Sequence, residues 1–262
     1  MIHGAVMTHS LETLIRSLHT RKGRERRDLA LAEGVRLVEE ALAAGVPVRA
    51  ALVAPGLEAT PRGAALAAAL RARSDRVGTV DDRTLAGLAA TEHPQGVVAV
   101  IAPKAWTLDA IGVGPLSAVL LLDGVQDPGN VGTMLRTAWS LGAAGVIALP
   151  GTAELTNPKA LRSAMGAYFR VPAVAATPEE MFAWLAHHRV ALWVAAAGGE
   201  PLPGLVRKGP VALVVGNEGA GVSDAVASQA VRRVGIPLRP GAESLNVGVA
   251  AGILLYEVLR ER

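Results

Sequence analysis

The sequence has 262 residues, a length that suits one large domain or two modest ones. Hydrophobic residues make up 51% of it and charged residues 19%, so a sizeable core can form, which argues against disorder. The net charge is only +3, and the absence of cysteine excludes a disulfide scaffold, a cysteine-based zinc site and a cysteine nucleophile.

The first hundred residues alternate between helical and extended patterns, which predicts a small α/β domain over residues 1–103. Helices are expected at Ala30–Leu42, Pro61–Arg73 and Thr84–Ala90. Strands are expected at Val48–Val53, Val77–Val80 and Gly96–Ala102. Residues 104–116 contain Pro and Gly with few periodic apolar residues, and we interpret them as a linker.

From Ser117 short apolar strands alternate with longer helices, which predicts a parallel sheet covered on both faces over residues 117–262. The expected strands are Ser117–Leu122, Val146–Leu149, Val171–Ala175, Val190–Ala196, Val211–Val215 and Val234–Pro237. The expected helices are Pro128–Leu141, Pro158–Ala167, Glu179–His187, Ser223–Ala230 and Leu245–Arg260. No stretch has the pattern of a membrane span, and residues 1–15 lack that of a signal peptide, so we expect a cytoplasmic protein.

Basic residues gather near the beginning of the sequence. Residues 1–27 contain six Arg or Lys and two Glu. The densest cluster consists of Arg21, Lys22, Arg24, Arg26 and Arg27. Such a cluster is typical of a surface that contacts phosphates, although a solvated face partly compensated by Glu25 also explains it.

Ligands of open parallel sheets bind beyond the carboxyl ends of the strands, and three unusual segments are expected there. In the first segment Asp127 and Pro128 predict a helix start, with Asn130 in the first turn. Arg136 lies about 100° around this helix from Leu135 on the apolar stripe, so it points away from the core. Arg136 is either a functional residue or an ordinary surface arginine.

The second segment is rich in glycine, which lets a ligand approach backbone amides closely. It contains Gly216, Asn217, Glu218 and Gly221. Its spacing is neither that of a P-loop nor that of a dinucleotide-binding fingerprint. A simple glycine turn with a solvated Glu218 is the alternative.

The third segment runs from Ile236 to Val247. Ser244 is a natural N-cap, and Asn246 enters a helix that is apolar on nearly every face and is therefore expected to be buried. A buried amide needs a partner or a ligand, although capping alone also explains both residues. No metal ligands stand at a suitable spacing, since adjacent helical residues such as His187 and His188 point apart.

Taken in order, the three segments form a specific combination. N-x-G-x-x-x-R at 130–136, G-N-E-G-x-G at 216–221 and I-P-L-x-x-G-x-x-S-L-N-V at 236–247 resemble the three motifs of the SpoU/TrmH family of the SPOUT superfamily. Members are RNA ribose 2′-O-methyltransferases. The resemblance covers about residues 117–260, and the preceding part looks more loosely like the small RNA-binding domain that many members carry.

The resemblance implies a sheet with a trefoil knot, a homodimer, an RNA substrate and S-adenosyl-L-methionine as the cofactor. The implied cofactor-binding residues are Gly216, Ile236, Leu245, Ala195, Ala196, Asn217 and Gly221. The implied catalytic residues are Arg136, Asn130, Glu218, Ser244 and Asn246. Because an arginine guanidinium stays protonated, Arg136 suits stabilisation of a developing alkoxide or contact with a phosphate better than a role as base.

Several alternatives remain open at the level of the sequence. The N-terminal domain favours ribosomal RNA by analogy, with transfer RNA as the alternative substrate. A non-catalytic RNA-binding protein would be expected to lack Arg136 or the pair Ser244 and Asn246, and all three are present. A dinucleotide-dependent dehydrogenase would need a G-x-G-x-x-G after an early strand, and none is visible.

Overall fold

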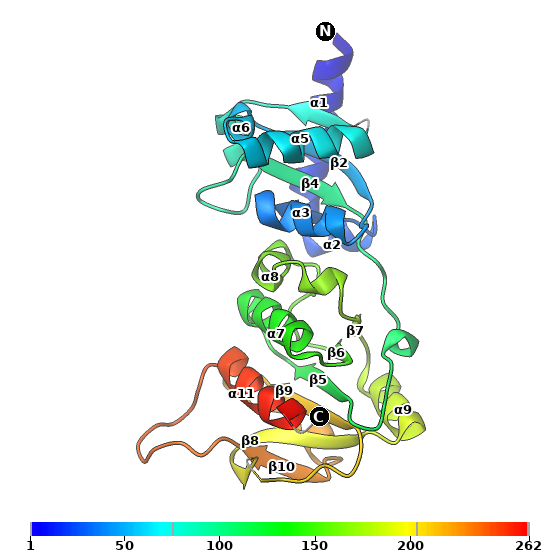
Figure 1. Ribbon diagram of the computed structural model, residues 1–262, viewed down its shortest axis with the longest axis vertical. Coiled ribbons are helices and arrows are strands. Elements are labelled where there is room, and N and C mark those ends of the chain that lie inside the picture. Colours follow the sequence, from blue (N-terminus) through cyan, green and yellow to red (C-terminus); the bar gives the residue numbers. More distant parts are fainter. Residues whose placement is uncertain (1, 75, 203, 261–262) are drawn as a thin grey trace. The chain divides into compact units, whose positions relative to one another are not determined.

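The computed structural model describes residues 2–74, 76–202 and 204–260, and the chain forms two compact units (Figure 1). Unit 1 consists of Met1–Lys104 and Thr156–Phe169. Unit 2 consists of Ala105–Leu155 and Arg170–Arg262. Within the described residues, no helix combines the length and the apolar character needed to cross a membrane.

Unit 1 is built on a four-stranded mixed sheet in the order β1-β4-β2-β3. The strands are β1 (Ala30–Glu33), β2 (Val48–Val53), β3 (Val77–Thr79) and β4 (Val97–Ile101). Strand β4 pairs antiparallel with β1 and β2, whereas β2 and β3 are parallel. The helices are α1 (Ile2–Leu18), α2 (Arg21–Glu25), α3 (Val35–Ala43), α4 (Pro55–Glu58), α5 (Pro61–Arg73), α6 (Asp82–Ala86), α8 (Pro158–Ala164) and the 3-10 helix η2 (Ala167–Phe169).

The helix predicted at Ala30–Leu42 is wrong in its first four residues. Ala30–Glu33 form strand β1, and helix α3 begins only after Gly34, whose φ is +89°. All four residues of β1 are buried, so the strand has no polar alternation to distinguish it from the apolar pattern of the helix that follows. Backbone pairing with β4 stabilises these four residues as a strand.

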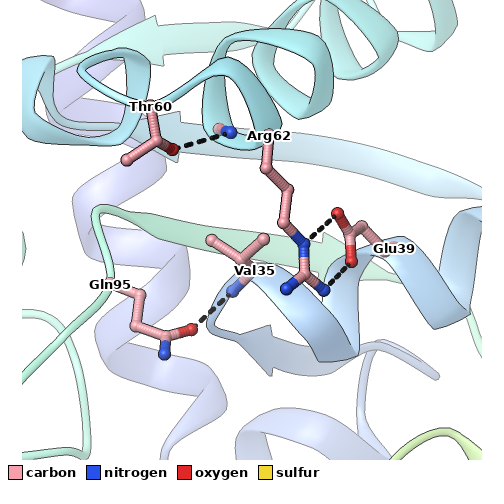
Figure 2. Close-up of polar contacts among 6 residues, drawn as sticks. Val35, Glu39, Thr60, Arg62 and Gln95 are labelled. Atoms are coloured by element: carbon pink, nitrogen blue, oxygen red, sulfur yellow. Dashed lines mark hydrogen bonds and ion pairs between the residues drawn. The ribbon is translucent and has the colours of Figure 1, made fainter.

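Side-chain contacts join the helices of unit 1 to their neighbours (Figure 2). Thr60 caps α5 by accepting a hydrogen bond from the Gly63 N–H at 3.1 Å, and Pro61 follows the cap, which explains why this helix was predicted correctly. The Arg62 guanidinium donates two hydrogen bonds to the Glu39 carboxylate on α3. These bonds hold the pKa of Glu39 below its usual range.

Unit 1 also includes a segment from beyond residue 117. Helix α8 packs against β1, and its Arg162 Nη1 lies 3.6 Å from a carboxylate oxygen of Glu33. Both carboxylate oxygens of Glu33 accept hydrogen bonds from the Ala90 N–H, at 3.1 and 3.0 Å. At Gly166 an added Cβ would lie 2.6 Å from the Glu40 Cβ, so only glycine fits. Contacts distant in sequence, which no local pattern reveals, place this segment in unit 1.

Unit 2 contains a six-stranded sheet in the order β10-β8-β9-β5-β6-β7, in which every pairing is parallel. The strands are β5 (Ala118–Asp123), β6 (Gly145–Ala148), β7 (Ala173–Ala175), β8 (Ala191–Pro201), β9 (Val211–Gly216) and β10 (Arg232–Gly235). The helices are η1 (Leu108–Ala110), α7 (Pro128–Leu141), α9 (Pro178–His188), α10 (Asp224–Ala227) and α11 (Val247–Arg260). The prediction of a parallel α/β sheet is therefore confirmed.

Helices cover both faces of this sheet. Val119 and Leu121 of β5 pack into a cluster with residues of α9 and with Val226 of α10. On the other face α11 packs against α7, β5 and β9 (Figure 1). Ile111 is 2% exposed within the cluster on the α9 side, so much of the segment 104–116, interpreted as a linker, is folded into unit 2.

Helix α11 differs from the expectation that it is buried all round. Ala251, Leu255 and other residues are buried against the sheet and α7. Val249, Ile253 and Tyr256 are instead 52%, 41% and 54% exposed, and their spacing of four and three residues places them on one stripe. A single chain therefore covers only one of the two apolar faces of α11.

We predict that Glu33 makes unit 1 less stable as the pH rises. Burial raises the pKa of Glu33, and the Ala90 hydrogen bonds and the charges of His19 and Arg162 only partly oppose it. The unfolded chain therefore loses this proton first, near 4.5, so stability falls between that pH and the higher folded-state pKa.

Urea unfolding of wild type and Glu33→Gln across about pH 4 to 8 measures this effect, because glutamine does not titrate. The stability of wild type minus that of the variant is expected to decrease as the pH rises. Glu39→Gln is the control with the opposite sign, since the lowered pKa of Glu39 gives stability that is lost as the pH falls through it. A difference for Glu33→Gln that grows with pH would contradict the assignment.

Candidate functional site

A pocket of about 540 Å³ lies beside the middle of β8 and at the carboxyl ends of β9 and β10. Three stretches of chain line it, namely residues 195–197 of β8, residues 215–221 at the end of β9, and residues 234–247 between β10 and the start of α11. Ala250 and Leu254 of α11 complete the lining. The pocket therefore lies where parallel sheets usually bind their ligands.

A bulge in β8 shapes one wall of the pocket. Trp193 and Val194 pair with Arg232 and Arg233, but the next residue of β10, Val234, pairs with Glu200. Residues 195–199 are therefore displaced from the regular ladder. Gly235 allows the close approach, because a Cβ added there would lie 2.9 Å from the Ala196 carbonyl oxygen. Small residues in this bulge leave room for a ligand beside the backbone.

Asn130, Glu218 and Asn246 form a hydrogen-bonded chain that joins the three motif segments. Asn130 Nδ2 donates to Glu218 Oε1 at 3.0 Å, and Asn246 Nδ2 donates to Asn130 Oδ1 at 3.1 Å. Asn246 Oδ1 in turn accepts from the Gly248 N–H at 2.9 Å, and the Asn130 N–H donates to the cap residue Asp127 at 3.0 Å. Asn246 is exposed and caps α11, which begins at Val247, so its expected burial and the expected capping role of Ser244 are wrong, although its amide does have partners within the chain.

The charge of Glu218 fixes the direction of this chain. Burial alone would raise the pKa of Glu218, but hydrogen bonds from Asn130 and from nearby backbone N–H groups outweigh it and lower the pKa. Glu218 is therefore a carboxylate at neutral pH and can only accept hydrogen bonds. The Asn130 amide must then point its NH₂ group at Glu218 and its oxygen at Asn246.

The pocket brings together most of the site residues expected from the sequence. All seven expected cofactor-binding residues line it. They are Ala195, Ala196, Gly216, Asn217, Gly221, Ile236 and Leu245. Glu218, Ser244 and Asn246 also line it, and Asn130 joins them through its hydrogen bonds. Sequence reasoning missed Ala250 and Leu254, although they follow Asn246 by four and eight residues on the same face of the helix, a spacing that could have indicated both.

Arg136 lies apart from these residues within one chain. It is exposed on α7 and does not line the pocket. In the part of the chain that the structure describes, its side chain has no hydrogen-bond or ion-pair partner. The prediction that Arg136 points away from the core is confirmed. Within a single chain, however, Arg136 is not among the residues that line the pocket.

The basic cluster of unit 1 divides into exposed and buried residues. Lys22 and Arg26 are exposed, Arg27 is half-buried, and Arg21 forms an ion pair with Glu25 at 2.6 Å. Arg24 is only 3% exposed and donates hydrogen bonds to the carbonyl groups of Leu18 and His19 at the end of α1. Arg24 thus holds the corner between α1 and α2, and its expected place on an RNA-binding surface is contradicted by its burial.

Comparison with known proteins agrees with the three motifs. Residues 117–256 match the SpoU rRNA Methylase family, and residues 13–99 match the MRM3-like substrate binding domain. The chain is 36% identical to the 23S rRNA (guanosine(2553)-2'-O)-methyltransferase RlmP of Bacillus subtilis (strain 168), over 93% of each protein. It is 33% identical to the 23S rRNA (uridine(2479)-2'-O)-methyltransferase of Streptomyces viridochromogenes, over 94% of this chain and 87% of the relative.

Solved structures show the same fold. The SpoU methyltransferase AviRb from Streptomyces viridochromogenes, in complex with the cofactor AdoMet, matches with a TM-score of 0.86 and 32% identity over 95% of this chain and 96% of that one. An AdoMet-bound rRNA methyltransferase from Sinorhizobium meliloti matches with a TM-score of 0.86 and 30% identity, over 97% and 95%. A parallel α/β sheet with a pocket at its carboxyl edge thus defines the class, and the chain belongs to the SpoU rRNA methylase family.

Proposed function

We propose that this protein transfers a methyl group from S-adenosyl-L-methionine to a ribose 2′-hydroxyl of ribosomal RNA. The observation that carries the proposal is the meeting of the three motif segments at one pocket, joined by the Asn130–Glu218–Asn246 hydrogen bonds. The relatives named above are methyltransferases of 23S rRNA, which favours ribosomal over transfer RNA. The same family membership argues against the dehydrogenase alternative.

The lining of the pocket and its charge suit this cofactor. Apolar side chains such as Val215, Leu238 and Leu245 line it together with glycine backbone, which suits an adenosyl group. The ionisable side chains among its described lining residues are the carboxylates of Glu218 and Glu243, which favour a cationic ligand. S-adenosyl-L-methionine would supply a methyl group on a positively charged sulfur.

The chain itself supplies orientation and charge for the reaction. We assign to Asn130, Glu218 and Asn246 the orientation of the ribose, because their amides and carboxylate are already fixed by one another. Ser244 lines the same pocket and can hydrogen-bond the sugar. Arg136 would stabilise the alkoxide that develops on the 2′-oxygen or contact the adjacent phosphate.

A homodimer would complete the site. Val249, Ile253 and Tyr256 form an exposed apolar stripe on α11, which a second copy can bury. Arg136 has no partner in the described part of its own chain, so we assign it to the pocket of the second copy. After edge strand β10 the chain returns to the middle of the sheet, where α11 packs on the central strands β5 and β9. This return of the chain also supports a trefoil knot.

The remaining assignments concern substrate binding and location. We propose that residues 1–103 bind RNA, with Lys22, Arg26, Arg27 and Arg21 contacting phosphates, and that residues 117–262 carry out methyl transfer. The match of residues 13–99 to a substrate binding domain supports this division. A ribosomal RNA substrate, as in the bacterial relatives, further implies a cytoplasmic protein.

The proposal is tested by methylation with radiolabelled cofactor. The purified protein is expected to label 23S ribosomal RNA but not bulk transfer RNA, and mapping of the label should give a ribose 2′-oxygen. Isothermal titration with S-adenosyl-L-methionine provides an independent readout of the pocket. If only transfer RNA is labelled, transfer RNA takes the place of ribosomal RNA as the proposed substrate. If the protein binds neither the cofactor nor RNA, the proposed function is refuted.

Arg136→Ala is expected to abolish methyl transfer and to spare cofactor binding, because the proposed cofactor contacts lie on other loops. The deleted donor is worth about 3–4 kcal/mol, a hundred- to thousand-fold in single-turnover rate. Arg136→Lys should restore activity only in part, since an ammonium lacks the planar fork of the guanidinium. Near-normal transfer by Arg136→Ala would remove this residue from the mechanism.

Mixed dimers show which subunit supplies the arginine. Co-expression of Arg136→Ala with Asn246→Ala should recover activity, because one site of the mixed dimer then has both an intact pocket and an arginine from the second copy. No recovery in isolated mixed dimers would place Arg136 at the pocket of its own subunit. A protein that is monomeric by light scattering at micromolar concentration would contradict the dimer itself.

Lys22→Ala/Arg26→Ala is expected to weaken RNA binding and to reduce the slope of its salt dependence by about 0.7–0.9 for each phosphate that the variant no longer neutralises. The matched control is Arg62→Ala/Arg71→Ala, which removes two positive charges that are already paired with Glu39 on α3 and Glu58 on α4. Binding is measured by filter retention over a range of salt concentrations. An equal decrease in affinity for both double variants would mean that net charge, not this cluster, determines affinity.

A further inference from the structure

The turn after β5 connects the central strand of unit 2 to the site. It begins at Asp123, continues through Gly124, whose φ is +71°, and leads to the N-cap of α7 at Asp127. The Gln126 N–H in this turn donates to the Glu218 carboxylate at 3.4 Å, and Asp127 accepts from the Asn130 N–H. The position of the turn therefore sets the position of two residues of the site.

Side chains from the loops that follow the two neighbouring strands, β6 and β9, hold Gly124. The Thr152 hydroxyl, on the loop after β6, accepts from the Gly124 N–H at 3.1 Å and donates to the Leu122 carbonyl at 2.9 Å. On the other side Asn217, after β9, donates from Nδ2 to the Gly124 carbonyl at 2.9 Å. Both polar backbone groups of Gly124 are thus bonded to side chains.

Further contacts of the turn reinforce this arrangement. Asp123 is 8% exposed, and its carboxylate accepts from the Ser223 N–H at 2.8 Å, beyond the far end of the glycine-rich loop. Asn217 Oδ1 accepts from the Gly219 and Ala220 N–H groups, both at 2.9 Å, so the loop that carries Glu218 is held by the same amide that holds Gly124. The loop and the turn are therefore fixed to each other.

We propose that Thr152 is a positioning residue for methyl transfer, acting through the Gly124 turn on Glu218 and Asn130. The inference rests on the proposed function. Thr152 itself does not line the pocket, so it acts on the site only through the turn that it holds. Displacement of reacting groups by even about 1 Å can cost a hundred-fold in rate.

Thr152→Val tests the proposal because it keeps the shape of the side chain and removes both hydrogen bonds of the hydroxyl. The single-turnover rate is expected to fall between about ten- and a hundred-fold at saturating cofactor and RNA, conditions under which any loss of cofactor affinity through Asn217 does not contribute. Thr152→Ser keeps the hydroxyl and should restore most of the rate. Thr152→Ala, which also lacks the hydroxyl, replaces Thr152→Val if that variant does not fold.

Thr177→Ala is the matched control, since Thr177 caps α9 in unit 2 through its own hydroxyl and has no bond to the turn. It should reduce thermal stability without slowing methyl transfer. If the wild type is active and Thr152→Val is equally fast, this inference is overturned but the proposed function stands. A Thr152→Ser variant as slow as Thr152→Val would have the same consequence. A wild type that methylates no RNA would overturn the proposed function and this inference with it.

Discussion

The hydrogen bonds of Asn130 are the interaction on which the site of this protein depends. They join the start of α7 to Glu218 after β9 and to Asn246 before α11, so they connect positions 88 and 116 residues apart in the chain. An ionised Glu218 accepts from Asn130, which leaves the Asn130 oxygen free to accept from Asn246. One charge therefore orders two neutral amides, and an ordered set of polar groups can hold a ribose without reorganising during the reaction.

The parallel sheet brings these distant residues together. In the order β10-β8-β9-β5-β6-β7, the carboxyl ends of β9 and β5 lie side by side, with Asp123 paired to Gly216. Each strand contributes the loop that follows it, so the first two motif segments meet at this edge. The third segment follows edge strand β10 and returns with α11, which packs across β9 and β5. The residues of the site are thus neighbours because of strand order and not because of sequence distance.

Local signals decided which elements could be predicted. The bounds of α5 and α7 were predicted correctly because Thr60-Pro61 and Asp127-Pro128 mark the helix starts chemically. Strand β1 was missed because burial on both faces removes the alternation that identifies a strand. The burial of Arg24 and the packing of α8 in unit 1 depend on contacts with distant segments, and composition carries no information about them.

The charge of the pocket bears on which groups the proposed reaction needs from outside its lining. Among the described lining residues, Glu218 and Glu243 give it a negative potential that favours a cationic methyl donor. The same potential disfavours both the phosphates of RNA and an alkoxide on the ribose, which is the physical reason for proposing a positive group from outside this lining. Arg136 is exposed and lies outside the pocket of its own chain, while the stripe formed by Val249, Ile253 and Tyr256 offers a surface for a second copy. In the proposed dimer, Arg136 and Glu218 of one site would belong to different subunits. Arg136 would then be unable to form an ion pair with Glu218 before the dimer and its substrate bring the two side chains to the ribose.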